Sequence, residues 1–166
     1  GDMEALDFIE WLCDLPYKHK IFIAGNHDDC MLDASLEGLP KDVHYLSDSG
    51  ITIDGISFYG APMFVVFGGE ELKEVEHYEQ IPDNTDILIT HRPPLGILDS
   101  IDDHIHYGSS ILLDKISNIK PQMHLFGHVH SAYGTMDWKG VTFSNAGLTD
   151  WKYDIQYSPQ LLEINI

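Results

Sequence analysis

The sequence is poor in the features that exported, disulfide-bonded or membrane-spanning proteins need. Cys13 and Cys30 are its only two cysteines, so no disulfide framework and no CxxC zinc site can be drawn. No apolar run approaches the ~18 residues that cross a bilayer, and the first residues lack the basic and apolar regions of a signal peptide. We therefore expect a cytoplasmic protein with no membrane partner.

Positive charge is also scarce. Nine Lys and Arg residues stand against 27 Asp and Glu residues, which gives a formal net charge of -18. Such a charge repels polyphosphate backbones and anionic membrane surfaces, so we expect no long nucleic acid partner. An anionic substrate would need a concentrated positive charge at its site, and a metal ion is the simplest source of one.

The length of 166 residues is that of one ordinary domain, and no linker or repeat divides residues 1–166. Apolar residues at helical spacing predict helices over 4–15 and 109–119. Short apolar runs predict strands over 20–24, 86–90 and 123–126, a hairpin over 51–59 around Asp54-Gly55, and later strands in GVTFSNAG and SPQLLEINI. Residues 70–80 are acidic and poorly patterned, which indicates an exposed loop or helix. This order of elements predicts a mixed α/β layer fold.

Three of the predicted strands end in the same way, on a group of polar side chains. IFIAG is followed by Asn26, His27 and Asp28; ILIT is followed by His91; and HLFG is followed by His128 and His130. The carboxyl ends of strands in α/β sheets converge on one rim, where ligands bind. Imidazole with amide or carboxylate oxygen suits divalent Zn, Mn, Fe or Ni, so the pattern predicts a catalytic metal site.

The remaining histidines carry weaker signals. His104 and His106 have the spacing of a metal-binding pair, but they follow no buried strand, and their acidic loop favours a solvated surface. The isolated histidines are predicted to be surface or capping residues: His19, His44, His77 and His124. Asp28 has two open interpretations, since it could cap the next segment or orient His27.

Together the motifs GNHD, THRPP and GHVH, in that order, resemble the calcineurin-like metallophosphoesterase family. The stretches THRPPLGILD, PQMHLFGHVHSAYG and FSNAG are similar to its small phosphodiesterase branch. The resemblance implies a β-sandwich of two mixed sheets flanked by helices, with two divalent metal ions at its rim, Mn, Fe, Zn or Ni. It implies an enzyme that hydrolyses phosphoester bonds.

The resemblance also implies a role for each motif residue. Asn26, His91 and His128 would bind the second metal, and His130 would bind the first. His27 would contact the phosphate and protonate the leaving oxygen, with Asp28 holding His27 in the right orientation.

The chain departs from the family pattern at its start. The family opens with a strand that carries Asp-x-His, and no such motif precedes Asn26. Gly1-Asp2 is the one match to the later Gly-Asp motif whose carboxylate bridges both ions. We therefore expect a domain that lacks its first strand, is incomplete at its N-terminal end and is impaired in activity.

Three functions remain open at this point. The first is a metal-dependent phosphodiesterase or phosphatase that acts on a small soluble phosphoester. The second is a non-catalytic metal- or nucleotide-binding module derived from such an enzyme. The third is a structural interaction protein, a homo-oligomer that covers its exposed sheet edge with a neighbour's strand.

Overall fold

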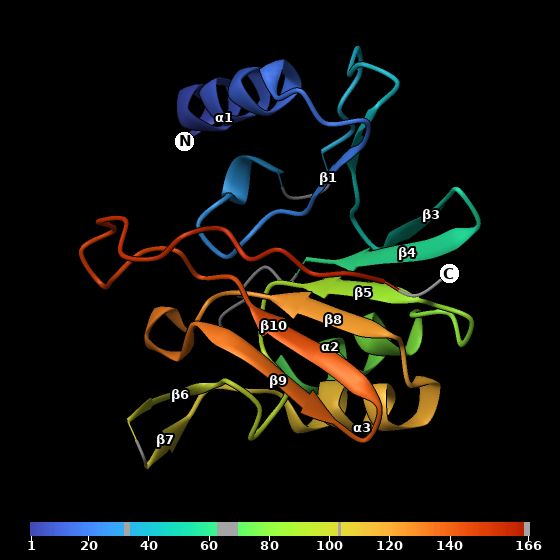
Figure 1. Ribbon diagram of the computed structural model, residues 1–166, viewed down its shortest axis with the longest axis vertical. Coiled ribbons are helices and arrows are strands. Elements are labelled where there is room, and N and C mark those ends of the chain that lie inside the picture. Colours follow the sequence, from blue (N-terminus) through green and yellow to red (C-terminus); the bar gives the residue numbers. More distant parts are fainter. Residues whose placement is uncertain (32–33, 63–69, 103, 165–166) are drawn as a thin grey trace.

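A six-stranded mixed sheet forms the centre of the structure, a computed structural model that describes residues 1–31, 34–62, 70–102 and 104–164. The strands lie in the order β3-β4-β5-β8-β10-β9 (Figure 1). Their bounds are β3 Ser49–Ile53, β4 Ile56–Ala61, β5 Ile87–Thr90, β8 Met123–Phe126, β9 Gly134–Trp138 and β10 Val141–Asn145. The four central strands run parallel, and β3 and β9 pair antiparallel at the two edges. The carboxyl ends of β5 and β8 therefore meet at the same edge of the sheet.

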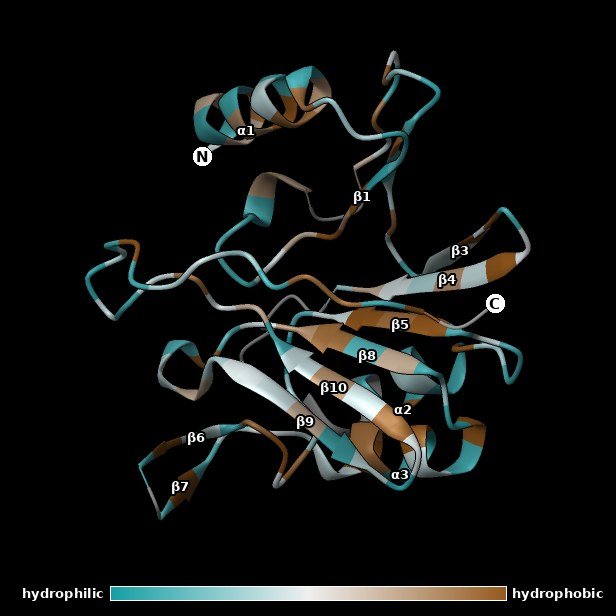
Figure 2. Cartoon of the chain, viewed as in Figure 1, coloured by the Kyte–Doolittle hydropathy of each residue, from teal (hydrophilic) through white to brown (hydrophobic). Residues whose placement is uncertain are grey.

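Two helices pack on the sheet and close its main core. They are α2 (Glu70–Glu79) and α3 (Ser110–Ile119), which lie together behind the sheet in Figure 1. Ser109 caps α3 by accepting a hydrogen bond from Leu112 N at 3.1 Å. The core combines both helices with the strands through Tyr59, Tyr78, Ile81, Leu88, Leu112, Ile116, Phe126 and Phe143. Figure 2 shows the hydrophobic colour concentrated on β5, in the middle of the sheet, as expected for a strand buried on both faces.

A second, smaller core lies around the first helix. The helix α1 (Asp2–Asp14) packs near the parallel pair β1 (Lys20–Phe22) and β2 (Val43–Tyr45), and Leu12, Phe22, Ala24, Met31 and Val43 form its buried cluster. Gly60 in β4 allows this part to approach the large sheet, since a Cβ there would collide with Leu46 and Ile23. The end of β1 thereby comes close to the edge where β5 and β8 end. No helix in the described ranges is long and apolar enough to cross a membrane.

Most of the predicted elements are confirmed. The structure contains the two predicted helices, the strands β1, β5 and β8, and the hairpin β3–β4, whose Asp54 and Gly55 both have positive φ. The predicted α/β class, with mixed sheets flanked by helices, is also confirmed. Residues 70–79 form a helix whose Tyr78 is fully buried.

Other elements differ from the prediction. SPQLLEINI contains no strand over 158–164, the part of it that the structure describes. Instead, Gln160 uses its side chain to bond the ends of β9 and β10, at Gly134 O and Asn145 O. The sequence patterns missed β2, β9 and the small hairpin of β6 (Ser100–Asp102) and β7 (Ile105–His106). β2, β6 and β7 have three residues or fewer, and the alternating β9 has only two large apolar residues, Met136 and Trp138, in its five.

His124 in β8 is fully buried, so the predicted surface or capping role is wrong for it. The hydroxyl of Thr90 donates to Arg92 O at 2.6 Å, and the same oxygen lies 2.8 Å from His124 Nε2. His124 Nε2 therefore donates to Thr90, and within the described chain His124 Nδ1 has no partner. Burial lowers the pKa of His124 to about 3.

Replacing His124 with Leu is expected to make stability less sensitive to acid. The folded chain keeps His124 neutral down to about pH 3, whereas the unfolded chain protonates it near 6.5. Between these values the unfolded state binds one more proton, so the free energy of unfolding falls by about 1.4 kcal/mol for each unit that the pH drops. The free energy of unfolding of both proteins should be measured in urea between about pH 4.5 and 6.5. Its decrease with falling pH should be smaller in the variant by the contribution of His124. Equal slopes would contradict a neutral buried ring.

Candidate metal centre

His91 and His128 meet where β5 and β8 end side by side. The His128 Nδ1 and His91 Nε2 atoms are 3.0 Å apart, and the two ring centroids are 4.8 Å apart. Asn26, which follows β1, brings its Oδ1 to 2.6 Å from His91 Nε2. Three potential metal donors thus converge from three separate strands, as the sequence predicted.

The backbone at His128 is held in an unusual conformation. His128 has φ +69, and Val129 N donates to Gly127 O at 2.8 Å across it. This is the geometry of a γ-turn with positive φ, which is rare and strained for a residue with a side chain. The turn directs the His128 ring toward His91, so the strain lies where the proposed ligands meet.

Asn145, at the end of β10, holds this turn in place. Its side chain is fully buried, and Nδ2 donates to Val129 O at 2.9 Å and to Leu98 O at 3.0 Å. Its Oδ1 accepts from Gly147 N at 3.0 Å. Both N–H groups and one of the two oxygen lone pairs of this amide are therefore hydrogen-bonded. These bonds connect the loop after β8 to β10, and β10 to the segment before β6.

Both histidines at the centre are suited to bind a cation. Burial lowers the pKa of His91 to about 3, and the neighbouring His128 ring adds to this effect. Burial also lowers the pKa of His128, and Arg92 contributes. Both rings are therefore neutral near pH 7, which is the form that binds a metal. His91 Nε2 donates to Asn26 Oδ1 in this structure, and that proton must leave Nε2 before the nitrogen can bind an ion.

His130 lies on the same side of the structure, at the start of the short 3-10 helix His130–Ala132. Its Nδ1 donates to Asp150 O at 2.8 Å, which leaves Nε2 without a proton on the neutral ring. A backbone carbonyl bound to the far nitrogen is the usual support of a metal-binding histidine. The orientation of His130 therefore fits a ligand.

His27 and Asp28 occupy the turn after Asn26. Gly25 N donates to Asp28 Oδ2 at 2.7 Å, and Asp28 N donates to Gly25 O at 3.1 Å, so the Asp28 carboxylate closes this turn. Between the described side chains of His27 and Asp28 there is no hydrogen bond. The group next to His27 Nε2 is the Tyr153 hydroxyl, at 3.3 Å.

One cavity of about 720 Å³ contains all five residues that the sequence predicted as ligands or as the phosphate contact, namely Asn26, His27, His91, His128 and His130. Its other walls include four aromatic side chains that the sequence patterns did not single out: Tyr107, Trp151, Tyr153 and Tyr157. Three of the four lie in the aromatic-rich stretch WKYDIQY, which was the sequence signal that could have identified them. That this stretch lines the same cavity as the histidines depends on the tertiary fold.

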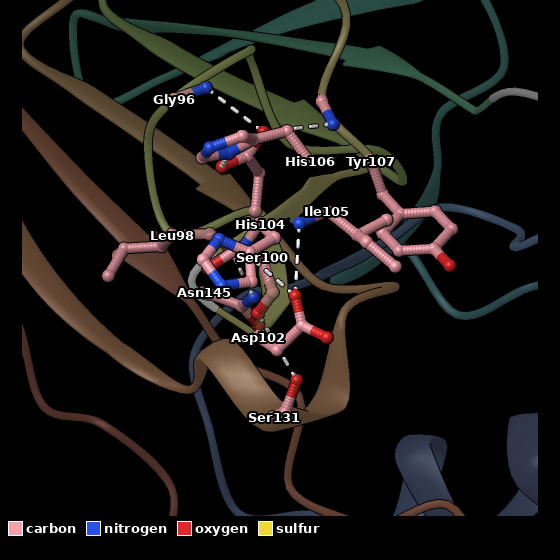
Figure 3. Close-up of polar contacts among 12 residues, drawn as sticks. Gly96, Leu98, Ser100, Asp102, His104, Ile105, His106, Tyr107, Ser131 and Asn145 are labelled. Atoms are coloured by element: carbon pink, nitrogen blue, oxygen red, sulfur yellow. Dashed lines mark hydrogen bonds and ion pairs between the residues drawn. The ribbon is translucent and has the colours of Figure 1, made fainter.

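The other candidate groups lie elsewhere. His104 and His106, which are drawn in Figure 3, are exposed, as predicted. His106 Nδ1 lies 2.8 Å from a carboxylate oxygen of the buried Asp99. Asp2 is exposed in the first turn of α1 and does not line the cavity. Arg92, the residue after His91, does not line it either. Arg92 Nη2 donates to Tyr107 O at 3.0 Å, and its Nη1 lies 3.6 Å from Glu74.

The donor set fits one divalent ion better than two. Across residues 1–31, 34–62, 70–102 and 104–164, no three His, Cys, Asp or Glu side chains are grouped closely enough to hold an ion. With the Asn26 amide as the third donor, however, His91 and His128 form an N₂O set, a chemistry suited to borderline divalent ions. His130 is the single predicted ligand outside this set.

Gly25 keeps space open for the His91 ring, which gives a direct test of the site. A Cβ on Gly25 would lie 2.9 Å from His91 Cε1, whereas a Cβ on Gly127 would meet no atom within 4 Å. Gly25→Ala is expected to displace His91 and weaken metal binding by about 10- to 100-fold, the range seen when a ligand is misoriented. Calorimetric titration with Mn²⁺ or Zn²⁺ measures this effect. Gly127→Ala is the matched control, and equal affinities in the two variants would argue against His91 as a ligand.

A family model and several known proteins match most of this chain. A family model described as calcineurin-like phosphoesterase matches residues 2–132. The UPF0046 protein C25E10.12 of Caenorhabditis elegans is 34% identical over 99% of this chain and 68% of its own length. Human metallophosphoesterase domain-containing protein 1 is 32% identical over 97% of this chain and 60% of its own length.

Two further matches bear on length and fold. The UPF0046 protein K07C11.7 of Caenorhabditis elegans is 33% identical over 94% of this chain and 61% of its own length. The chain thus spans about 60% of the length of the human and K07C11.7 relatives. A solved crystal structure matches with a TM-score of 0.62 and 20% identity over 87% of this chain and 63% of its own, which is a likeness of fold.

Proposed function

Because the chain belongs to the calcineurin-like phosphoesterase family, we propose that it hydrolyses a small soluble phosphoester with the help of bound divalent metal. The observation that carries this proposal is that His91 Nε2 lies 2.6 Å from Asn26 Oδ1 and 3.0 Å from His128 Nδ1, where three strands end. His91 is hydrogen-bonded to both Asn26 and His128, and the three side chains offer the N₂O set that suits a borderline divalent ion.

In this proposal each residue of the site has one role, either in metal binding or in contact with the substrate. Asn26, His91 and His128 would hold one ion, and His130 would contribute to a second, weaker one. When bound, divalent ions supply Lewis-acid polarisation of the phosphoryl group and an activated water. His27 would contact the phosphate and donate a proton to the leaving oxygen, while Asp28 keeps the Gly25–Asp28 turn closed beneath it.

The lining of the cavity favours a diester over a monoester. None of its described lining residues is Lys or Arg, and the whole chain carries a formal net charge of -18. A phosphomonoester brings about two negative charges at pH 7 and a diester brings one, so the field of this protein opposes the monoester more strongly. We expect a phosphodiesterase.

A second candidate is a metal-binding module without catalysis. It is favoured by the donor count, since His130 alone serves the second ion. Metal-free protein loaded with Mn²⁺, Zn²⁺, Fe²⁺ or Ni²⁺ should be assayed with bis(p-nitrophenyl) phosphate and p-nitrophenyl phosphate, and its bound metal should be counted. Metal-dependent turnover of the diester supports the hydrolase, and bound metal without turnover of either ester supports the module.

A further inference from the structure

The segment after β10 forms a tight loop over the metal centre. Thr149 and Ile155 pair as an antiparallel bridge. The Asp150 carboxylate closes the loop, since its Oδ1 accepts from Lys152 N at 2.8 Å and Asp154 N at 3.1 Å. One carboxylate thus fixes the backbone on both sides of Tyr153, so the place of this tyrosine is determined by the loop.

The Asp150 loop holds Tyr153 in a conformation that burial of the Tyr153 side chain does not offset. Its φ is +66, a region that disfavours residues with a Cβ and costs roughly 1–3 kcal/mol. Its side chain is 64% exposed, so burial in a core does not offset this strain. A strained backbone that presents an exposed aromatic ring inside a cavity points to a role in function.

The ring of Tyr153 lies between two histidines of the site. It meets His27 edge to face at a centroid distance of 6.2 Å and His130 at 5.7 Å. Its hydroxyl is 3.3 Å from His27 Nε2. A phenol both donates and accepts, so it can hold this nitrogen in either tautomer of the neutral ring.

The same loop also supports His130. The Asp150 carbonyl accepts from His130 Nδ1 at 2.8 Å and from Tyr153 N at 3.0 Å. Asp28, to which the family resemblance assigned the orientation of His27, instead accepts from Gly25 N. The group that contacts His27 therefore comes from a segment 126 residues away in the chain.

We infer that Tyr153 is the positioning residue for His27, fixing its imidazole through the hydroxyl and the face of its ring. The inference rests on the proposed function, in which His27 contacts the phosphate. Tyr153 restrains the rotation of the His27 ring, which reduces the conformational freedom that must be lost between the bound substrate and the transition state. Its removal should therefore affect turnover more than binding.

The test combines kinetics with a double-mutant cycle. Tyr153→Phe is expected to lower kcat about tenfold, as for a misoriented catalytic group, with KM changed less than twofold. In a His27→Gln background the same substitution should change kcat by less than twofold, since the residue that it positions is gone. An equal loss in both backgrounds, or no loss in the wild type, would overturn the inference.

A spectroscopic measurement keeps this inference separate from the hydrolase proposal. In metal-free protein, the ring nitrogens of His27 can be observed by long-range ¹H–¹⁵N correlation and assigned with His27→Gln. Tyr153→Phe should shift the His27 Nε2 signal. Tyr133→Phe, which removes a hydroxyl that donates to Ser158 O at 2.8 Å on the same C-terminal segment, should not shift it. An unmoved signal in Tyr153→Phe would refute the contact even if the chain hydrolyses diesters, and a moved signal would support it even if it hydrolyses none.

Discussion

Replacing His91 with Ala is expected to abolish the metal-dependent phosphodiester hydrolysis proposed for this chain. His91 Nε2 lies within 3.0 Å of both other donors, Asn26 Oδ1 and His128 Nδ1, so its loss breaks the set at its centre. A loss of about 4 kcal/mol of transition-state stabilisation corresponds to roughly 10³-fold in kcat/KM. The measurement is the initial rate with bis(p-nitrophenyl) phosphate at saturating Mn²⁺, together with calorimetric metal titration.

The stability of the metal-free chain separates this loss from unfolding. His91 is neutral in the folded state because burial lowers its pKa to about 3, so its removal uncovers no buried charge. Metal-free His91→Ala should therefore still unfold cooperatively in urea. His104→Ala, which removes an exposed histidine outside the cavity, is the matched control and should keep wild-type activity. Retention of metal binding by His91→Ala would contradict the proposed centre.

Asn145→Asp is expected to destabilise the fold strongly, because it changes one group of a fully buried amide. The buried Nδ2 donates to Leu98 O and Val129 O, and a carboxylate would turn an acceptor toward both carbonyls. Burying an unpaired charge and leaving two carbonyls unsatisfied costs about 3–5 kcal/mol. Urea unfolding followed by tryptophan fluorescence measures this loss.

The pH dependence of Asn145→Asp gives a second check. Burial without a cation partner is expected to raise the pKa of the introduced Asp above its unfolded value of about 3.9. The folded variant then retains its proton above this value, so its stability falls further as pH rises toward neutrality. Asn84→Asp places the same change on an exposed loop and should shift stability by less than about 0.5 kcal/mol. Equal effects at the two positions would show that the Asn145 hydrogen bonds contribute nothing.

The strand-end motifs were predictable because each is a local signal. An apolar run such as ILIT followed directly by His91 indicates both a buried strand and a polar group at its carboxyl end. Because the carboxyl ends of strands in an α/β sheet lie at one edge, three such runs predict that their polar groups lie close together. The structure places Asn26, His91 and His128 in contact as this logic requires. The roles assigned to these residues remain predictions.

The edges of the fold were less predictable for a physical reason. β9 has one partner strand and β2 lies in a two-stranded sheet, so neither needs the continuous apolar sequence of β5. His124 shows the opposite case, in which a polar residue in a strand is fully buried. Its hydrogen bond to Thr90 comes from the neighbouring strand, and no sequence pattern within β8 reports it.

By itself the sequence determined the α/β class, the main helices and strands, and the group of donors at three strand ends. Those features depend on residues within a few positions of one another. The tertiary structure alone decided that Asn145 fixes the loop of His128, that Asp28 closes a turn, and that Tyr153 meets His27. The Asn145 and Tyr153 contacts join segments distant in the chain, and their partners are selected by the pairing of strands and the closure of a loop, which short-range patterns do not encode.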